Sequence, residues 1–176
     1  MVQFTKRATV QATAQAVWKT FAHDFDNADV WMASVPHSYG KDNGEAFDRA
    51  QTCGRVCELT PNSEGMKASE RFLAYDEDSK TCTVRIDFVD TPLFFPVHHN
   101  TLEFSIVDTA DGQSEMTWVF RSKIKPLAYL MWPLLRVGFG VFVGQIIQEL
   151  AYYVENGTPH PRKVQAANKL ALKSGA

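Results

Sequence analysis

The sequence is poor in cysteine, has no excess of basic residues and lacks a glycine-rich phosphate loop. Its three cysteines, Cys53, Cys57 and Cys82, are an odd number without a secretory signal, so we expect reduced thiols in a cytoplasmic protein. The net charge of −2 gives no reason to expect a nucleic acid as partner. No HxxxH pair or carboxylate cluster offers metal ligands at a suitable spacing, and we expect neither a metal nor another cofactor.

Two further absences restrict the chemistry. The chain has no nucleophile elbow and no Ser-His-Asp order suited to a triad, which disfavours covalent catalysis. The missing phosphate loop disfavours nucleotide chemistry in the same way. The segment 158–176 contains four basic residues and no acidic one. We expect it to be a flexible C-terminal tail after a single domain of residues 1–157.

What the sequence does contain is a regular succession of short strands. The alternation of apolar and polar residues predicts a first strand over residues 2–11. Thr13 is then a suitable N-cap for a helix over 14–23, and a short helix over 26–33 should follow. Five clear strands and one weak strand within 35–50 complete an antiparallel sheet; the clear ones are 54–60, 66–75, 81–89, 97–108 and 113–124.

The last predicted element is a long helix over 126–155, ended by Asn156 and Gly157. Its apolar run is long enough to suggest a membrane span, but Arg136 near the middle and Pro133 weigh against one. One apolar stripe should grip the sheet: Leu135, Phe139, Phe142, Val143, Ile146, Leu150 and Tyr153.

The opposite face of this helix is still apolar in its first half. We favour coverage by a ligand or by a second copy in a homodimer. Peripheral contact with a membrane is the alternative interpretation. The residues concerned are Leu127, Leu130, Met131, Leu134, Val137 and Val141.

Several segments, in their order along the chain, resemble the START-like or SRPBCC superfamily, and especially its polyketide cyclase/dehydratase branch. They are Val10–Trp18, Asp24–Asn27 with Trp31, Gly54–Glu58 and Glu70–Asp76. The resemblance covers nearly the whole chain, to about residue 157. It implies an α+β helix-grip fold, in which a curved antiparallel sheet of six to seven strands wraps around a long C-terminal helix, with two short helices after the first strand. A hydrophobic cavity would lie between the sheet and the helix.

Members of this superfamily include polyketide cyclases and dehydratases, binders of lipids and hormones, and ubiquinone-binding helpers. They share no universal catalytic residues, so candidates in this chain must come from strand parity. In the strand over 97–108, the parity of Leu102, Phe104 and Ile106 places His98 and Asn100 on the inner face. His98 could then transfer a proton, and Asn100 could orient a carbonyl or an enolate.

Parity is ambiguous for Glu70 and Arg71. A buried Glu70 could act as an acid or base, and an inward Arg71 would favour an anionic head group. We favour a third interpretation, a cross-strand ion pair on the outer face. The residues expected to hold a ligand are Trp31, His37 and Tyr39 at the cavity entrance, with Glu70, Phe104, Trp118, Phe120, Leu130 and Leu134.

Two functions remain open at this point. In the first, the chain binds a hydrophobic or aromatic small molecule and catalyses a cyclase-like or dehydratase-like reaction through His98. In the second, it is a non-catalytic carrier of a lipid or quinone that docks on a membrane or protein through the early part of its last helix.

Overall fold

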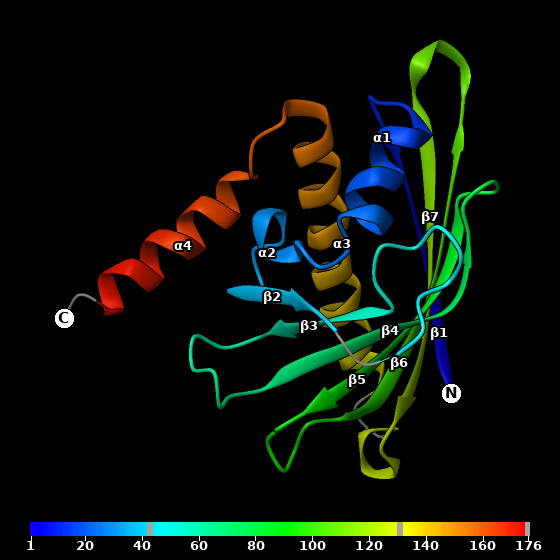
Figure 1. Ribbon diagram of the computed structural model, residues 1–176. Helices are drawn as coiled ribbons and strands as arrows, with labels where there is room; N and C mark the ends of the chain where they lie inside the picture. Colours follow the sequence, from blue (N-terminus) through cyan, green and yellow to red (C-terminus); the bar gives the residue numbers. More distant parts are fainter. Residues whose placement is uncertain (42–43, 130–131, 175–176) are drawn as a thin grey trace.

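Seven antiparallel strands form one open, curved sheet in the order β1-β7-β6-β5-β4-β3-β2 (Figure 1). The computed structural model describes residues 1–41, 44–129 and 132–174, apart from the side chains of residues 127, 132, 134, 173 and 174. The predicted α+β helix-grip fold is confirmed. The strands are β1 Val2–Val10, β2 His37–Gly40, β3 Gly54–Glu58, β4 Lys67–Asp76, β5 Thr81–Val89, β6 Val97–Asp108 and β7 Ser114–Ile124.

Three short helical segments follow β1 and cover one end of the sheet. Thr13 caps α1 (Ala14–Trp18) as predicted, because its hydroxyl oxygen accepts a hydrogen bond from the Ala16 N–H at 3.3 Å. A π-helical turn, η1 (Lys19–His23), continues α1. The helix α2 (Ala28–Trp31) is shorter than the predicted segment 26–33.

Glu77, in the turn between β4 and β5, ties these helices to the sheet. Its carboxylate accepts hydrogen bonds from Trp18 Nε1 at 2.8 Å and from the Tyr75 hydroxyl at 2.7 Å, and His23 Nε2 lies 2.9 Å away. Burial alone would raise the pKa of Glu77, but these hydrogen bonds lower it to about 2.

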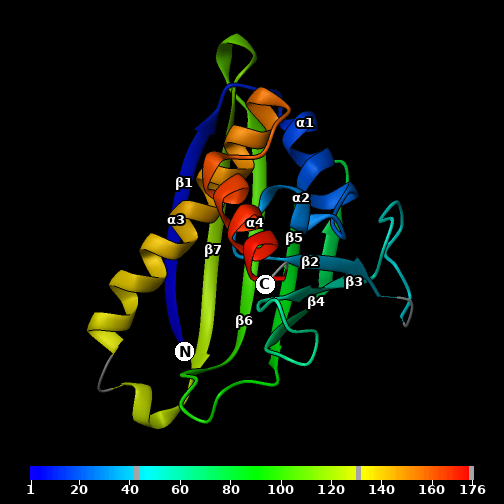
Figure 2. The same ribbon diagram turned by 90° about the vertical axis from the view of Figure 1, so that its left-hand side faces the viewer.

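The long helix α3 (Trp132–Asn156) lies against the concave face of the sheet (Figures 1 and 2). Its predicted start at residue 126 is wrong. A 3₁₀ turn, η3 (Pro126–Tyr129), precedes it, and Pro133 falls in its first turn, where a missing N–H costs little. Its end is as predicted, because Gly157 adopts a φ of 66°.

The gripping stripe of α3 is largely as predicted. Val143, Ile146 and Leu150 are buried against the sheet and the short helices, whereas Val137 and Val141 on the other side are exposed. By length and composition, Leu135–Asn156 could cross a bilayer, but it is the core helix of this fold.

The basic segment after Gly157 forms a helix, α4 (Pro161–Ser174), which the sequence analysis did not predict. It projects away from the sheet in Figure 1 and is held mainly by its first turn. Arg162 Nε donates to the buried carboxylate of Glu149 at 2.9 Å, and Lys163 Nζ donates to the Val35 carbonyl at 2.8 Å. Glu149 also accepts a hydrogen bond from the Ala33 N–H at 2.9 Å.

Aromatic rings fill the space between α1, η1 and the sheet. Phe21 stacks on Phe104 with a centroid distance of 4.0 Å, and the Trp118 ring meets both edge-on. Trp18 also stacks on Phe104, with a centroid distance of 6.1 Å. This cluster closes one end of the layer between sheet and helix, and the cavity lies beyond it.

Candidate functional site: a cavity between the sheet and the long helix

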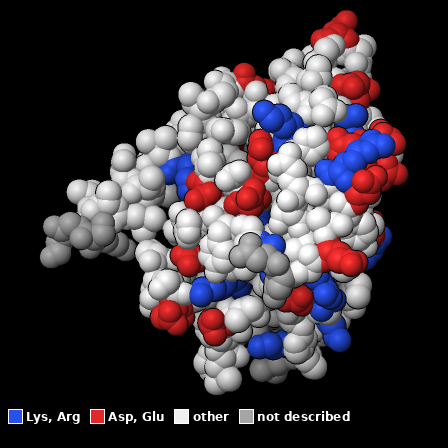
Figure 3. All heavy atoms as spheres, viewed as in Figure 1, with Lys and Arg blue, Asp and Glu red and all other residues white. Residues whose placement is uncertain are grey.

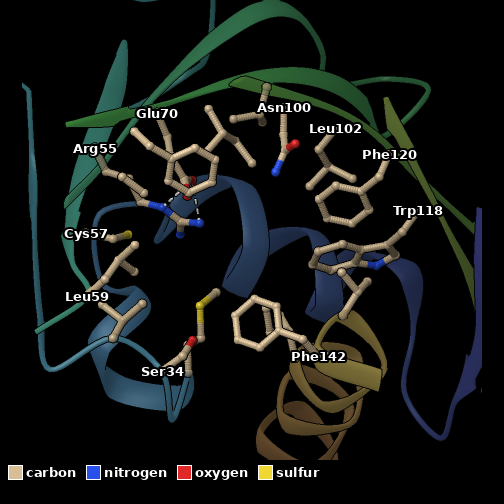
Figure 4. A pocket seen from close by; sticks show the side chains of 18 of the residues that line it. Ser34, Arg55, Cys57, Leu59, Glu70, Asn100, Leu102, Trp118, Phe120 and Phe142 are labelled. Atoms are coloured by element: carbon tan, nitrogen blue, oxygen red, sulfur yellow. Dashed lines mark hydrogen bonds and ion pairs between the residues drawn. The ribbon is translucent and has the colours of Figure 1, made fainter. Parts of the chain in front are cut away.

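A mainly apolar cavity of about 100 Å³ lies between α3 and the inner face of the sheet (Figure 4). Strand parity explains its walls. Alternate residues of β5 point inward, and so do those of β6 and β7. Aromatic rings form much of its surface, namely Phe21, Phe25, Phe88, Trp118, Phe120, Phe139 and Phe142.

One wall carries a buried ion pair. Arg55 on β3 and Glu70 on β4 are direct cross-strand partners, and both line the cavity. Arg55 Nε and one of its terminal nitrogens lie 2.8 Å and 2.7 Å from Glu70 Oε2. The remaining terminal nitrogen donates to the Phe25 carbonyl at 2.7 Å, and the guanidinium lies 4.0 Å from the centre of the Phe25 ring. The pair is therefore neutral overall and firmly held.

Burial and the ion pair together decide the protonation states of Arg55 and Cys57 in this wall. Desolvation alone would lower the pKa of Arg55, but the Glu70 carboxylate raises it above its ordinary value. Burial raises the pKa of the neighbouring Cys57 thiol to about 12. Cys57 is thus a neutral thiol at physiological pH and behaves as a small apolar group.

Two polar groups in the cavity wall have no protein partner. Asn100 is 2% exposed, and its Oδ1 accepts no hydrogen bond from any described residue. The Ser34 hydroxyl, in the segment after α2, is likewise buried and unpartnered. Figure 4 shows the Asn100 carboxamide directed into the cavity. Because an unpaired buried polar group costs about 1–3 kcal/mol, Asn100 is a candidate for contact with a ligand.

The cavity opens beside the middle of α3. Phe142 lines it while remaining 42% exposed, and Met32, from the segment after α2, also lines it. Methionine has three rotatable bonds, and a half-exposed ring can turn outward. These two side chains can widen the cavity without moving the sheet.

The structure contradicts the inward position predicted for His98. Asn100 faces the cavity as parity requires, but the β6–β7 ladder shifts register between Val97 and His99. Parity cannot be extended across such an irregularity, and His98 is exposed at the strand's start. The two residues are therefore not brought together in one site.

The three residues predicted at the cavity entrance do not line the cavity. Trp31 is buried in the core, and its Nε1 has no partner among the described residues. His37 and Tyr39 occupy the outer face of β2, with ring centroids 5.7 Å apart. His37 lies 3.5 Å from the carboxylate of Asp29. Ser38, between them, is the inward residue of this strand.

The predicted ion pair of Glu70 exists, but it lies on the inner face and not on the outer one. Its partner Arg55 was missed, although Arg55 shares strand parity with the buried Cys57. That parity was the available signal. Arg71 points outward, as the exposed neighbour of Glu70.

The remaining predicted ligand residues divide into three groups. Trp118 and Phe120 line the cavity. Phe104 lies behind them in the aromatic core. Leu130 and the side chain of Leu134 lie outside the described residues. Across the described part of the chain, no three His, Cys, Asp or Glu side chains gather at a metal-binding distance.

The curved sheet, the gripping helix and the inner cavity define a helix-grip protein of the SRPBCC, or START-like, superfamily. The sequence profile of the family "Polyketide cyclase / dehydrase and lipid transport" matches residues 1–155, and the chain belongs to this family. The family predicted from the sequence is thereby confirmed. No curated protein matches the chain significantly.

Solved structures show the same fold at low sequence identity. A START superfamily protein from Mycobacterium smegmatis is 13% identical with a TM-score of 0.69, covering 89% of this chain and 99% of its own. Ara h 8.0201 is 15% identical with a TM-score of 0.59, covering 87% and 97%. The major latex-like protein 151 from Panax ginseng is 15% identical with a TM-score of 0.58, covering 86% and 96%.

Proposed function

We propose that the protein binds a neutral, mainly apolar small molecule that carries a hydroxyl group next to Asn100, whose Oδ1 can accept its hydrogen bond. The observation that carries this proposal is the unpartnered Oδ1 of Asn100 in a mainly apolar, aromatic wall. In an apolar cavity, a ligand is usually oriented by a few precisely placed polar groups. The family supports binding of hydrophobic molecules in general.

The neutrality of the ligand follows from the ion pair. The Glu70 carboxylate already neutralises Arg55, whose N–H groups bind Glu70 and the Phe25 carbonyl. A carboxylate on the ligand would have to compete with Glu70 in a site of low polarity, and its desolvation would cost several kcal/mol. A hydroxyl group carries no such penalty and can donate to Asn100 Oδ1.

The size of the cavity sets a second condition. An apolar cavity of about 150 Å³ in another protein accommodates benzene, so about 100 Å³ is too small for a ligand of several rings as the side chains stand. A larger ligand requires Phe142 and Met32 to move aside. Phe142 is half-exposed at the opening, whereas Met32 is buried, so its movement would change the packing around it.

We favour reversible binding over a cyclase-like or dehydratase-like reaction. Proton transfer needs a group within hydrogen-bond reach of the ligand, and His98 does not line the cavity. Among the described lining residues, Glu70 is the one carboxylate, and its Oε2 is already held by Arg55. Docking through the early part of α3 remains a prediction, supported by the exposed Val137 and Val141.

Three compounds with the same rings test the proposal: 1-naphthol, naphthalene and 1-naphthoate. Fluorescence titration should give tighter binding of naphthol than of naphthalene, and naphthoate should bind at least tenfold more weakly than naphthol. Asn100→Leu should remove most of the preference for naphthol over naphthalene. Ser122→Ala is the matched control, because Ser122 is buried and unpartnered opposite Asn100 but does not line the cavity.

Two results would contradict the proposal. Tightest binding of naphthoate would mean that Arg55 is available to anions. No binding of any of the three compounds would mean that Phe142 and Met32 do not move aside and that the cavity admits no ligand of two rings.

A further inference from the structure

The loop between β5 and β6 exposes two large apolar side chains side by side. Leu93 is 84% and Phe94 is 89% exposed. The Phe95 N–H donates to the Pro92 carbonyl at 2.9 Å, which closes a tight turn with Leu93 and Phe94 at its two central positions. The turn therefore holds both side chains away from the protein, where neither can be buried within the chain.

The turn is firmly attached to the rest of the fold at its base. Phe95 packs edge-on against Phe88, with ring centroids 4.9 Å apart. The Pro96 carbonyl accepts a hydrogen bond from the Lys125 N–H at 2.8 Å. The exposure of Leu93 and Phe94 is thus a property of an anchored turn, and both figures place this loop next to η3 at one end of the sheet (Figures 1 and 2).

Lysines flank the turn on both sides. Lys67 lies opposite Val89 at the end of β5, and Lys123 lies opposite His99 on the far side of β6. Lys125 follows at the Pro96 contact. Within the described residues, none of these three lysines forms an ion pair, and Asp90 is the one acidic residue of residues 90–96.

A polar and aromatic rim completes this end of the molecule. Tyr129 in η3 is exposed, and its hydroxyl accepts a hydrogen bond from the Met1 ammonium group at 3.1 Å. Tyrosine is typical of the boundary between lipid and water. In Figure 3 the loop is the white projection at the lower edge, with basic side chains beside it.

We propose that the Leu93–Phe94 turn inserts into the surface of a membrane that contains anionic phospholipids. An apolar tip can enter the boundary of the acyl chains while the flanking lysines bind anionic head groups. A protein partner fits less well, because lysine is depleted from protein interfaces and the tip projects where a protein interface would be flat. On the face shown in Figure 3, the described residues form no continuous basic patch that would suit a nucleic acid.

The position of the turn relates this surface to the cavity. Phe88 lines the cavity and is the ring on which Phe95 packs. The inserted turn would thus be separated from the cavity by a single aromatic contact. The docking surface does not depend on the proposed ligand, however, and it can be tested without one.

Sedimentation with vesicles tests the proposal with the full chain. Vesicles of phosphatidylcholine with 30 mol% phosphatidylserine should bind the protein at least tenfold more tightly than vesicles of phosphatidylcholine alone. The variant Leu93→Asn/Phe94→Asn should lose at least tenfold in affinity for the mixed vesicles. Val107→Asn is the matched control, since Val107 is an exposed apolar residue at the other end of β6, and it should bind like the wild type.

A second pair of variants tests the charges. Lys123→Gln/Lys125→Gln should weaken binding to the mixed vesicles several-fold and reduce its dependence on salt. Lys19→Gln/Lys80→Gln, away from the turn, should have little effect. All variants should melt within about 2 °C of the wild type, because the changed side chains contribute little to the core.

Either of two results would overturn the proposal. The first is a wild-type protein that binds neither type of vesicle. The second is a turn variant that binds the mixed vesicles as tightly as the wild type. Binding of 1-naphthol in vesicle-free buffer should be the same in the turn variant and the wild type, so failure of the docking surface can be told from failure of the proposed cavity ligand.

Discussion

At the scale of single residues, Glu70 should have a large effect on stability. Glu70→Gln would leave the Arg55 guanidinium buried without a counter-charge, and we expect a loss of roughly 3 kcal/mol in the free energy of unfolding. Urea unfolding at pH 7 measures it. Glu103→Gln is the matched control, because Glu103 pairs with Arg121 across strands on the outer face and should contribute less than about 1 kcal/mol. Equal losses in the two variants would contradict the buried pair.

Glu77 should make stability depend on pH in the acidic range. Its pKa of about 2 in the folded protein lies below the ordinary value of 4.5, so its contribution is present above pH 4.5 and is lost as the pH falls towards 2. The linkage relation gives a loss of roughly 2 kcal/mol between pH 7 and pH 3.

The variant Glu77→Gln isolates this effect. The difference in unfolding free energy between wild type and variant should shrink by about 2 kcal/mol from pH 7 to pH 3, as measured by urea unfolding. Titrating groups that do not contact Glu77 are common to both proteins and cancel; His23, which lies 2.9 Å from Glu77, is replaced by Gln in both backgrounds. A difference that stays constant over this range would show that the hydrogen bonds to Glu77 do not depend on its charge.

At the scale of elements, β3 and β4 approach each other too closely for a side chain at Gly54. A Cβ atom there would lie 2.2 Å from the Glu70 carbonyl oxygen and 2.9 Å from the Arg71 Cα. Gly54→Ala should therefore cost about 1–3 kcal/mol in unfolding free energy. Gly138→Ala in α3 is the control of opposite sign: its Cβ would meet nothing within 4 Å, and higher helix propensity should add about 0.5–1 kcal/mol. A stabilising Gly54→Ala would contradict the close approach.

The sequence predicted well those strands in which apolar and polar residues alternate clearly. The alternation in β6 and β7 placed Asn100, Trp118 and Phe120 on the inner face, and all three line the cavity. His98 was misplaced because a register shift at the start of β6 leaves no trace in the pattern of residue types.

Two other features depend on contacts that periodicity does not encode. Arg55 meets Glu70 only through the register of β3 on β4, and a charged residue on an inner face contradicts the usual pattern. Trp31 was expected at the cavity, but a residue in the four-residue helix α2 has no periodic neighbours to fix its direction. Tertiary packing decides both positions.

At the scale of the whole molecule, a ligand in the cavity should stabilise the native state. A compound that binds only the folded protein adds about 2.7 kcal/mol at a hundred times its Kd. For a chain of 176 residues this corresponds to a rise of roughly 5–10 °C in Tm. Thermal unfolding with 1-naphthol should show this rise, and the same concentration of 1-naphthoate should show much less. An unchanged Tm at a hundred times the Kd would mean that the compound binds the unfolded chain as well as it binds the folded protein.

The order of the strands has a consequence for how the chain acquires its structure. Every pairing from β2 to β7 joins strands that follow one another in sequence, whereas β1 pairs with β7, more than a hundred residues further on. Local hairpins form quickly, and distant pairings wait for their loops to close. During synthesis, β2 to β7 can therefore assemble as they emerge, while β1 waits for β7 and the sheet waits for α3. Until that last helix arrives, the cavity wall is an open apolar surface, and this is the stage at which the nascent chain should most need a chaperone.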